Sequence, residues 1–129
     1  MSIDPAAPGP AALAFLTERH LAILTTIRPD QTLHACAVGF TYDHESRLVR
    51  IICSRTSVKA RNAERAGRAV VGQVDGPRWL SLEGNARLRT DAESVEEAVR
   101  RYAARYRTPS PNPERVVIEI VVERILGRG

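Results

Sequence analysis

The sequence predicts a mainly β protein with short helices, built on a six-stranded antiparallel sheet that is closed or nearly closed into a barrel. Six apolar or alternating runs have the length of strands, and several are joined by short polar turns, which favours antiparallel neighbours. No βαβ alternation, internal repeat or second domain is evident. We expect a flexible lead-in over residues 1–12 and a single barrel domain over residues 13–129.

The first half of the chain begins with a short helix pattern and continues with three strand patterns. Residues 11–19 are expected to form the helix, because a proline precedes them and suits a first turn. Residues 20–27 form the first expected strand, closed by the turn signal Arg28-Pro29-Asp30. Residues 33–42 and 48–54 follow as strands joined by a short polar turn, so we expect them to be antiparallel neighbours.

The middle of the chain predicts a helix and a hairpin. Residues 57–66 are expected to be helical and to end at Gly67, because glycine is favoured just after a helix. Strands over 69–74 and 79–89 are separated by a Gly-Pro turn. The second of these alternates clearly between apolar and polar residues, but Gly84 interrupts it, which indicates a bulge or a close backbone approach.

The last third of the chain predicts a helix, an extended connection and a final strand. Residues 90–93 offer a capping box, and apolar residues at helical spacing follow from 95 to 106. Three prolines keep residues 107–113 extended. Residues 115–126 alternate again and form the sixth expected strand, with Glu119 on the polar face.

The composition is that of an ordinary globular protein, with 43% hydrophobic and 26% charged residues in a chain of 129. No apolar run reaches the roughly 20 residues of a membrane span, and no secretory signal pattern occurs at the N-terminus. The two cysteines lie in apolar runs, which favours buried thiols in the cytoplasm. The net charge of +4 favours acidic partners, but the arginines are dispersed and aromatic residues make up only 5%, which argues against nucleic acid.

The junction between the strand at 48–54 and the following helix contains the only lysine among nineteen basic residues. A helix N-terminus offers free backbone N–H groups to an anion. Arg55, Ser57, Lys59 and Asn62 surround this point and would suit a phosphate group, through a bidentate guanidinium, a hydroxyl and a point charge. The alternative is a capped surface helix with solvated cations.

One face of the strand at 33–42 carries nearly all small residues, including Ala37 and Gly39. Small side chains let a planar ring system lie close to the backbone, so Ala37, Val38 and Gly39 are candidate cofactor contacts. The alternative is tight packing of this face against a helix or a second subunit. Trp79 follows the Gly-Pro turn and could lie at a pocket mouth, or pack in the core or an interface.

The chain lacks the motifs that mark a catalytic nucleophile, a nucleotide-binding loop or a metal site. The three histidines, at 20, 34 and 44, have no metal-ligand spacing. We therefore expect no metal and no catalytic side chain, so that any reactivity resides in a cofactor.

Several segments resemble the pyridoxamine-phosphate-oxidase-like split β-barrel family, whose fold is FMN-binding-like. The segments that carry the resemblance lie at residues 14–22, 37–41, 73–84, 105–109, 111–113 and 116–119. The likeness extends over roughly residues 13 to 127 and is strongest to the actinobacterial branch that uses the deazaflavin coenzyme F420, in its biliverdin reductase group.

The resemblance implies a homodimer with a cofactor site at the subunit interface, and a hydride transfer from reduced F420 to biliverdin or a similar conjugated substrate. In this family the basic strand-to-helix segment holds the cofactor phosphate, which corresponds here to Arg55, Ser57, Lys59 and Asn62. Arg78 is a candidate substrate contact by its position. An FMN-dependent oxidoreductase on the same barrel and a non-enzymatic flavin or tetrapyrrole carrier are the alternatives.

Overall fold

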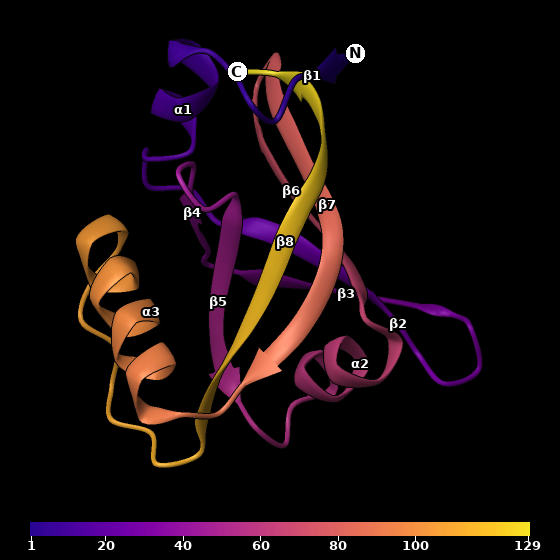
Figure 1. Ribbon diagram of the computed structural model, residues 1–129, viewed down its shortest axis with the longest axis vertical. Coiled ribbons are helices and arrows are strands. Elements are labelled where there is room, and N and C mark those ends of the chain that lie inside the picture. Colours follow the sequence, from indigo (N-terminus) through magenta and orange to yellow (C-terminus); the bar gives the residue numbers. More distant parts are fainter.

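The computed structural model describes residues 1–129 and contains one antiparallel sheet curled into an open barrel, with three helices outside it (Figure 1). The elements follow the chain in this order: β1 (Ser2–Ile3), α1 (Pro10–Phe15), β2 (Ala22–Ile27), β3 (Leu33–Val38), β4 (Thr41–Asp43), β5 (Leu48–Ser54), α2 (Val58–Ala66), β6 (Arg68–Asp75), β7 (Arg78–Arg89), α3 (Ala92–Arg105) and β8 (Arg115–Arg128). The mainly β architecture with a barrel-like antiparallel sheet is thus confirmed.

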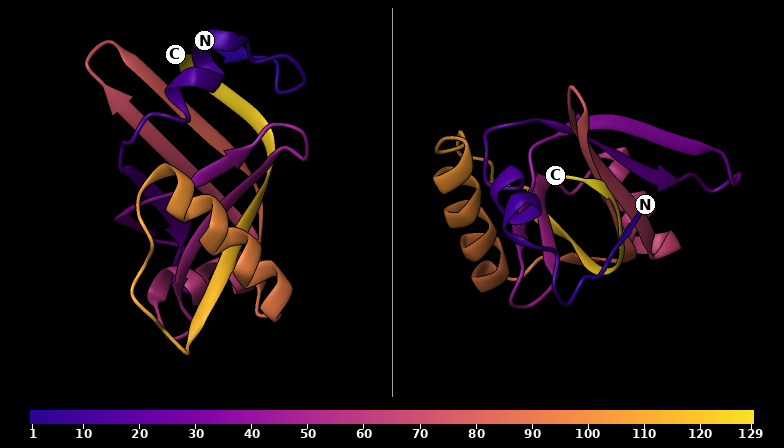
Figure 2. Two further views of the ribbon diagram at one scale, coloured as in Figure 1. Left: turned by 90° about the vertical axis from the view of Figure 1, so that its left-hand side faces the viewer. Right: turned by 90° about the horizontal axis from the view of Figure 1, so that it is seen from above.

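The strand order is β3-β2-β6-β7-β8-β5-β4, and every pairing is antiparallel. Viewed from above, the strands bend around a central space, with α3 on one side and α2 on another (Figure 2). β3 and β4 are the two ends of this path, so each leaves one edge without a partner strand. The free edge of β3 matters for the site described below.

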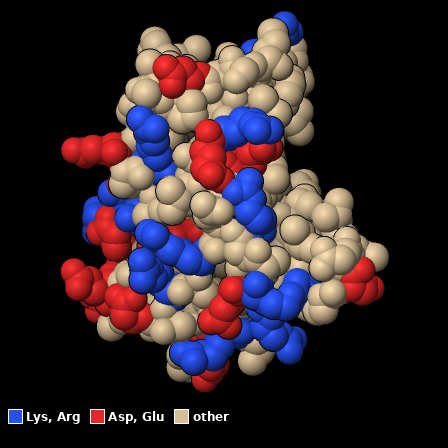
Figure 3. Space-filling view, turned by 45° about the vertical axis from the view of Figure 1, so that its right-hand side comes forward, with Lys and Arg blue, Asp and Glu red and all other residues tan.

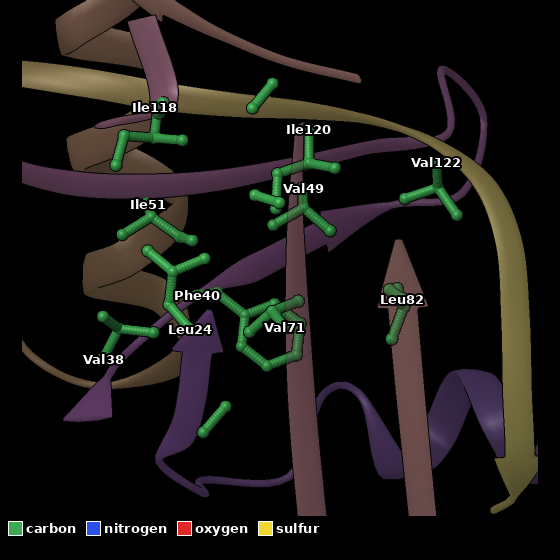
Figure 4. Packing of buried hydrophobic residues seen from close by; sticks show 14 of the residues in the cluster. Leu24, Val38, Phe40, Val49, Ile51, Val71, Leu82, Ile118, Ile120 and Val122 are labelled. Carbon is green, nitrogen blue, oxygen red and sulfur yellow. The ribbon is translucent and has the colours of Figure 1, made fainter. Parts of the chain in front are cut away.

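The core fills the barrel with side chains from five long strands (Figure 4). Leu24 of β2, Ile51 of β5, Val71 of β6, Leu82 of β7 and Ile118 of β8 are all essentially inaccessible to solvent. Each comes from the apolar face of an alternating strand, so the period of two in the sequence directly placed them inside.

Gly84 shows the close backbone approach expected of it, and it lies opposite a bulge whose extra residue belongs to β8. The register between β7 and β8 shifts between Glu83 and Gly84, where β8 contributes one extra residue. A Cβ atom on Gly84 would lie 1.9 Å from the Val121 carbonyl oxygen, which no side chain could tolerate. The predicted C-terminus of the second helix is also confirmed, because Gly67 adopts φ 70° and closes α2.

The predicted strand over 33–42 is wrong in one respect, because the chain leaves the strand at Gly39 and Phe40 and forms β3 and β4 separately. The physical reason lies in α3. The Phe40 N–H donates to the Tyr106 hydroxyl, and the Phe40 carbonyl accepts from the Arg105 guanidinium. These backbone groups therefore bond to the helix rather than to a neighbouring strand.

Other boundaries differ from the sequence predictions by a few residues. α1 ends at Phe15 rather than residue 19, because Thr17 donates its amide and its hydroxyl to the Ala14 carbonyl in a turn. The cap of α3 is Asp91, which accepts from the Ser94 amide, so the capping box expected at residues 90–93 does not form. Eight strands replace the expected six, because β4 is separate and Ser2–Ile3 pairs with the end of β8.

Candidate functional site

The N-terminus of α2 lies directly after β5, and Ser57 caps it. The Ser57 hydroxyl accepts from the Ala60 amide and donates to the Ser54 carbonyl. This cap leaves the amides of the first helical turn at Val58 and Lys59 pointing outward without helix partners. An anion at this point would meet backbone N–H groups and the positive end of the helix dipole.

Two cations flank this helix end without being engaged elsewhere. The Arg55 guanidinium is exposed and the Lys59 ammonium is half-buried, and neither makes a side-chain hydrogen bond or ion pair. Lys59 lies within electrostatic reach of the Cys53 thiol, and burial raises the pKa of that thiol. Arg55, Ser57 and Lys59 thus all lie at the N-terminal end of α2, where Ser57 is engaged in the helix cap and the two cations have no partner within the chain.

Asn62 lies on the same helix but faces inward. It is 2% exposed, its amide N–H₂ donates to the Thr26 hydroxyl of β2 at 3.1 Å, and its carbonyl oxygen accepts from Arg65. Both ends of the amide are thus engaged within the chain. Asn62 therefore fixes α2 against β2, whereas Arg55 and Lys59 make no such bond within the chain.

The free edge strand β3 has the small outward face that the sequence predicts along most of its length. Ala35 and Ala37 are exposed, whereas the Val38 side chain is buried in the core. Val38 can therefore reach a ligand only through its backbone. Because no strand pairs with the outer edge of β3, its N–H and C=O groups are available to the amide edge of a flat ring.

Gly39 is packed tightly against a helix, which is the alternative to a face open to a ligand. A Cβ atom here would lie 2.9 Å from the Tyr102 ring and 3.1 Å from the Tyr106 ring. The two tyrosines of α3 thus cover this residue. The small-residue surface ends at Ala37, and the rings of Tyr102 and Tyr106 begin where it stops.

Large apolar side chains are exposed on the same outer face of the sheet. They are Leu21, Ile23, Leu33, Val74 and Trp79, with exposures between 38% for Trp79 and 69% for Val74. Ile23 pairs with Ala37 across β2 and β3, and Val74 pairs with Trp79 across β6 and β7. Trp79 is thus neither in the core nor in a pocket of the single chain, but belongs to an exposed apolar face.

Arg78 is held by two carboxylates. Its guanidinium donates to both oxygens of Glu18, at 2.8 and 2.9 Å, and to Asp75, and it lies 4.4 Å from the centre of the Phe15 ring. The hydrogen bonds from Arg78, followed by that from His20, lower the pKa of Glu18 to about 2. Arg78 therefore joins the β6–β7 hairpin to the end of α1, and a substrate would have to compete with Glu18 for it.

A group of residues that the sequence did not indicate holds α3 to the barrel. Arg105 donates to the carbonyls of Glu18 and Phe40 and to the side chain of buried Gln73, while the Tyr106 hydroxyl donates to the His20 carbonyl at 2.6 Å. We call Arg105 and Tyr106 the α3 clasp. Its partners lie more than 30 residues away in sequence, so no local pattern could reveal it.

Charged side chains of both signs are interspersed over the surface, and the face in Figure 3 shows no single basic block. Most arginines near an acid are paired with it, as Arg87 and Arg89 are with the buried Glu119. Cations that make neither an ion pair nor a side-chain hydrogen bond, such as Arg55 and Lys59, are therefore the candidates for ligand contacts. No helix of the structure has the length and apolar character needed to cross a membrane.

Comparison with known proteins identifies the family. The profile described as pyridoxamine 5'-phosphate oxidase matches residues 9–129. The chain belongs to the pyridoxamine 5'-phosphate oxidase family. Within the family, it is 59% identical over 116 residues to an F420H(2)-dependent biliverdin reductase from Mycobacterium tuberculosis, a match that covers 90% of this chain and 85% of that protein.

Solved structures of this family share the fold at low identity. A pyridoxamine 5'-phosphate oxidase-like protein from Listeria innocua has a TM-score of 0.74 at 24% identity, with 90% of this chain and 94% of that chain covered. An F420 reductase has a TM-score of 0.73 at 22% identity, with 92% and 96% covered. These likenesses support the split-barrel architecture that the strand order defines.

Proposed function

We propose that this protein is an F420H2-dependent reductase that converts biliverdin, or a similar conjugated molecule, to its reduced form. The observation that carries the proposal is the pair of unengaged cations, Arg55 and Lys59, at the capped N-terminus of α2, a helix that packs on β2, the strand that pairs with the free edge strand β3. The high identity to a biliverdin reductase that uses F420H(2) supports the same activity.

The residues of the α2 end fit the phosphate of a deazaflavin cofactor. Arg55 and Lys59 would supply charge, the first-turn amides would supply hydrogen bonds, Ser57 would hold the start of the helix through its cap, and Asn62 would hold the helix in place. The ring system would lie along β3, against Ala35 and Ala37 and the backbone of Val38. When bound, the reduced cofactor supplies a hydride that the central methine carbon of biliverdin accepts, while a pyrrole nitrogen takes a proton, giving bilirubin.

The chain's own residues then have three tasks: they bind the phosphate, orient the ring along the strand edge, and exclude water from it. The exposed apolar face that includes Ile23, Leu33 and Trp79 is suited to cover by a second copy of this chain. We propose that such a homodimer encloses the cofactor at its interface. Cys36 and Cys53 are both free thiols, which fits a cytoplasmic protein.

A titration followed by a single mixing experiment tests the proposal. We expect the protein to bind coenzyme F420 at least about tenfold more tightly than FMN, measured by fluorescence. Mixing with F420H2 and biliverdin should replace the biliverdin absorbance by that of bilirubin. Tighter binding of FMN would favour the FMN-dependent oxidoreductase, and binding without turnover of any tetrapyrrole would favour a carrier.

A further inference from the structure

A pocket of about 360 Å³ lies at the end of β3 opposite α2. It is lined by Arg19, His20, Leu21, Tyr102, Tyr106 and Arg107. Six residues that come from the α1–β2 loop and from the end of α3 thus meet in one place. We propose that this tyrosine–arginine pocket receives the substrate: its two exposed arginines bind carboxylates, and its tyrosines contact the conjugated ring system. The inference rests on the proposed function.

The position of the pocket follows from the strand register. Asn62 of α2 bonds to Thr26, which pairs with His34 at the start of β3, whereas Tyr102 and Tyr106 contact Gly39 just past its end. Five residues of extended strand separate these ends, which is roughly 17 Å. With its phosphate at α2, an elongated cofactor would extend along β3 toward the tyrosines. The substrate would therefore meet the reactive ring at the pocket.

The cations of the pocket are unengaged, as are those at α2. Arg19 and Arg107 are exposed and take part in no ion pair or side-chain hydrogen bond. By contrast, Arg101 on the neighbouring turn of α3 is bound to Glu97 and Asp43, and Arg105 is held in the α3 clasp. Two unsatisfied guanidinium groups in one pocket with two tyrosines suit a planar dicarboxylate.

The aromatic wall is rigid. The rings of Tyr102 and Tyr106 lie 4.9 Å apart and are inclined by 33°. The Tyr106 hydroxyl is fixed between the His20 carbonyl and the Phe40 amide, whereas the Tyr102 hydroxyl has no partner in the chain. Tyr102 is therefore free to hydrogen-bond a ligand while its ring is supported from behind.

The pocket also continues onto the apolar outer face. Leu21 lines it and is 64% exposed, and Ile23 follows two residues later on the same face of β2, opposite Ala37. A conjugated tetrapyrrole has an apolar ring system with two propionates on one edge. Its rings would lie toward Leu21 and Tyr102, with the propionates at Arg19 and Arg107.

A charge-specific substrate comparison tests this. Biliverdin dimethyl ester carries two neutral methyl esters in place of the propionate carboxylates, so a change in the ratio of the two KM values between wild type and variant reports carboxylate binding. We expect the wild-type holoenzyme to favour the diacid by roughly tenfold. The double variant Arg19→Gln/Arg107→Gln should reduce this preference to about twofold or less, and the Kd for biliverdin, measured by its induced circular dichroism on the protein with oxidised F420, should rise roughly tenfold.

Arg47→Gln is the matched control, because Arg47 is exposed and unpaired but lies in the β4–β5 turn. It should leave both the preference and the Kd as in the wild type. Retention of the full preference by the double variant would overturn the inference while leaving the reductase activity intact. Binding of F420 without any binding or reduction of biliverdin by the wild type would instead overturn both the substrate assignment and this pocket.

Discussion

The α2 end of the barrel and the hairpin corner near α1 both concentrate basic residues, but they use them in opposite ways. At α2, Arg55 and Lys59 have no acidic partner within the chain. At the hairpin corner, Arg78 is bound by Glu18 and Asp75, with His20 beside them. An unpaired cation is available to an anionic ligand, whereas a paired one contributes to how the elements are joined. The two regions therefore differ in whether their basic side chains are unpaired, and not in whether basic residues are present.

The largest expected effect concerns the α3 clasp, whose cation is engaged within the chain. Arg105→Ala removes the donors to Phe40, Glu18 and Gln73 and leaves buried Gln73 Oε1 without its partner. We expect the free energy of unfolding to fall by about 3 kcal/mol. Urea denaturation measures this. Arg100→Ala on the same helix, where the arginine is exposed and bound only to Glu97, should change it by less than about 0.5 kcal/mol.

Equal losses in the two helix variants would contradict a structural role for the clasp. They would mean that the free energy of unfolding depends on the total charge of α3 rather than on the hydrogen bonds of Arg105.

A second prediction tests the ligand side. Arg55→Ala/Lys59→Ala should weaken F420 binding by about 100-fold, corresponding to about 2.7 kcal/mol, because both cations that face the phosphate are lost. Thermal stability should stay close to the wild type, since neither side chain has a partner to lose. Titration of cofactor fluorescence and a melting curve provide the two measurements.

The paired arginine offers the contrasting variant. Arg78→Gln should lower the melting temperature by releasing Glu18 and Asp75, with F420 affinity unchanged within about twofold. If Arg78→Gln lost as much F420 affinity as the double variant, the hairpin corner could no longer be assigned a purely structural role.

The smallest effect concerns the pH dependence of the hairpin corner. The pKa of Glu18 is lowered from 4.5 to about 2, chiefly by its hydrogen bonds with Arg78. A depressed carboxyl pKa stabilises the folded state above the unfolded value, and this stabilisation is lost as the pH falls from about 4.5 to about 2. Glu18→Gln should therefore be less stable than the wild type at pH 7, with the difference shrinking across that acidic window.

Thermal melts of both proteins between pH 2 and 7 give the difference curve, in which the separate acidic titration of Glu97 cancels. Curves that stay parallel through the window would show that Glu18 is not coupled to Arg78 in solution.

Local sequence patterns predicted some features of this structure and missed others. The alternation of β7 and β8 and the glycines at 67 and 84 follow local rules, so the core faces, the bulge and the end of α2 were predictable. The split of the strand at Gly39 was not, because it depends on bonds from Arg105 and Tyr106 more than 60 residues later. The candidate cluster at α2 could be proposed from the sequence because its members are close together in the chain.

Local patterns and resemblance were sufficient for the mainly β class, the position of most strands and helices, the segment around Lys59 as a candidate anion site, and the membership of a cofactor-binding family. Tertiary structure alone decided which charges are free. It paired Arg78 with Glu18, turned Asn62 inward to Thr26, and brought Arg19 and Arg107 to the two tyrosines. The physical reason is that hydrogen bonds and ion pairs depend on distances of about 3 Å between segments far apart in the chain, which no local periodicity specifies.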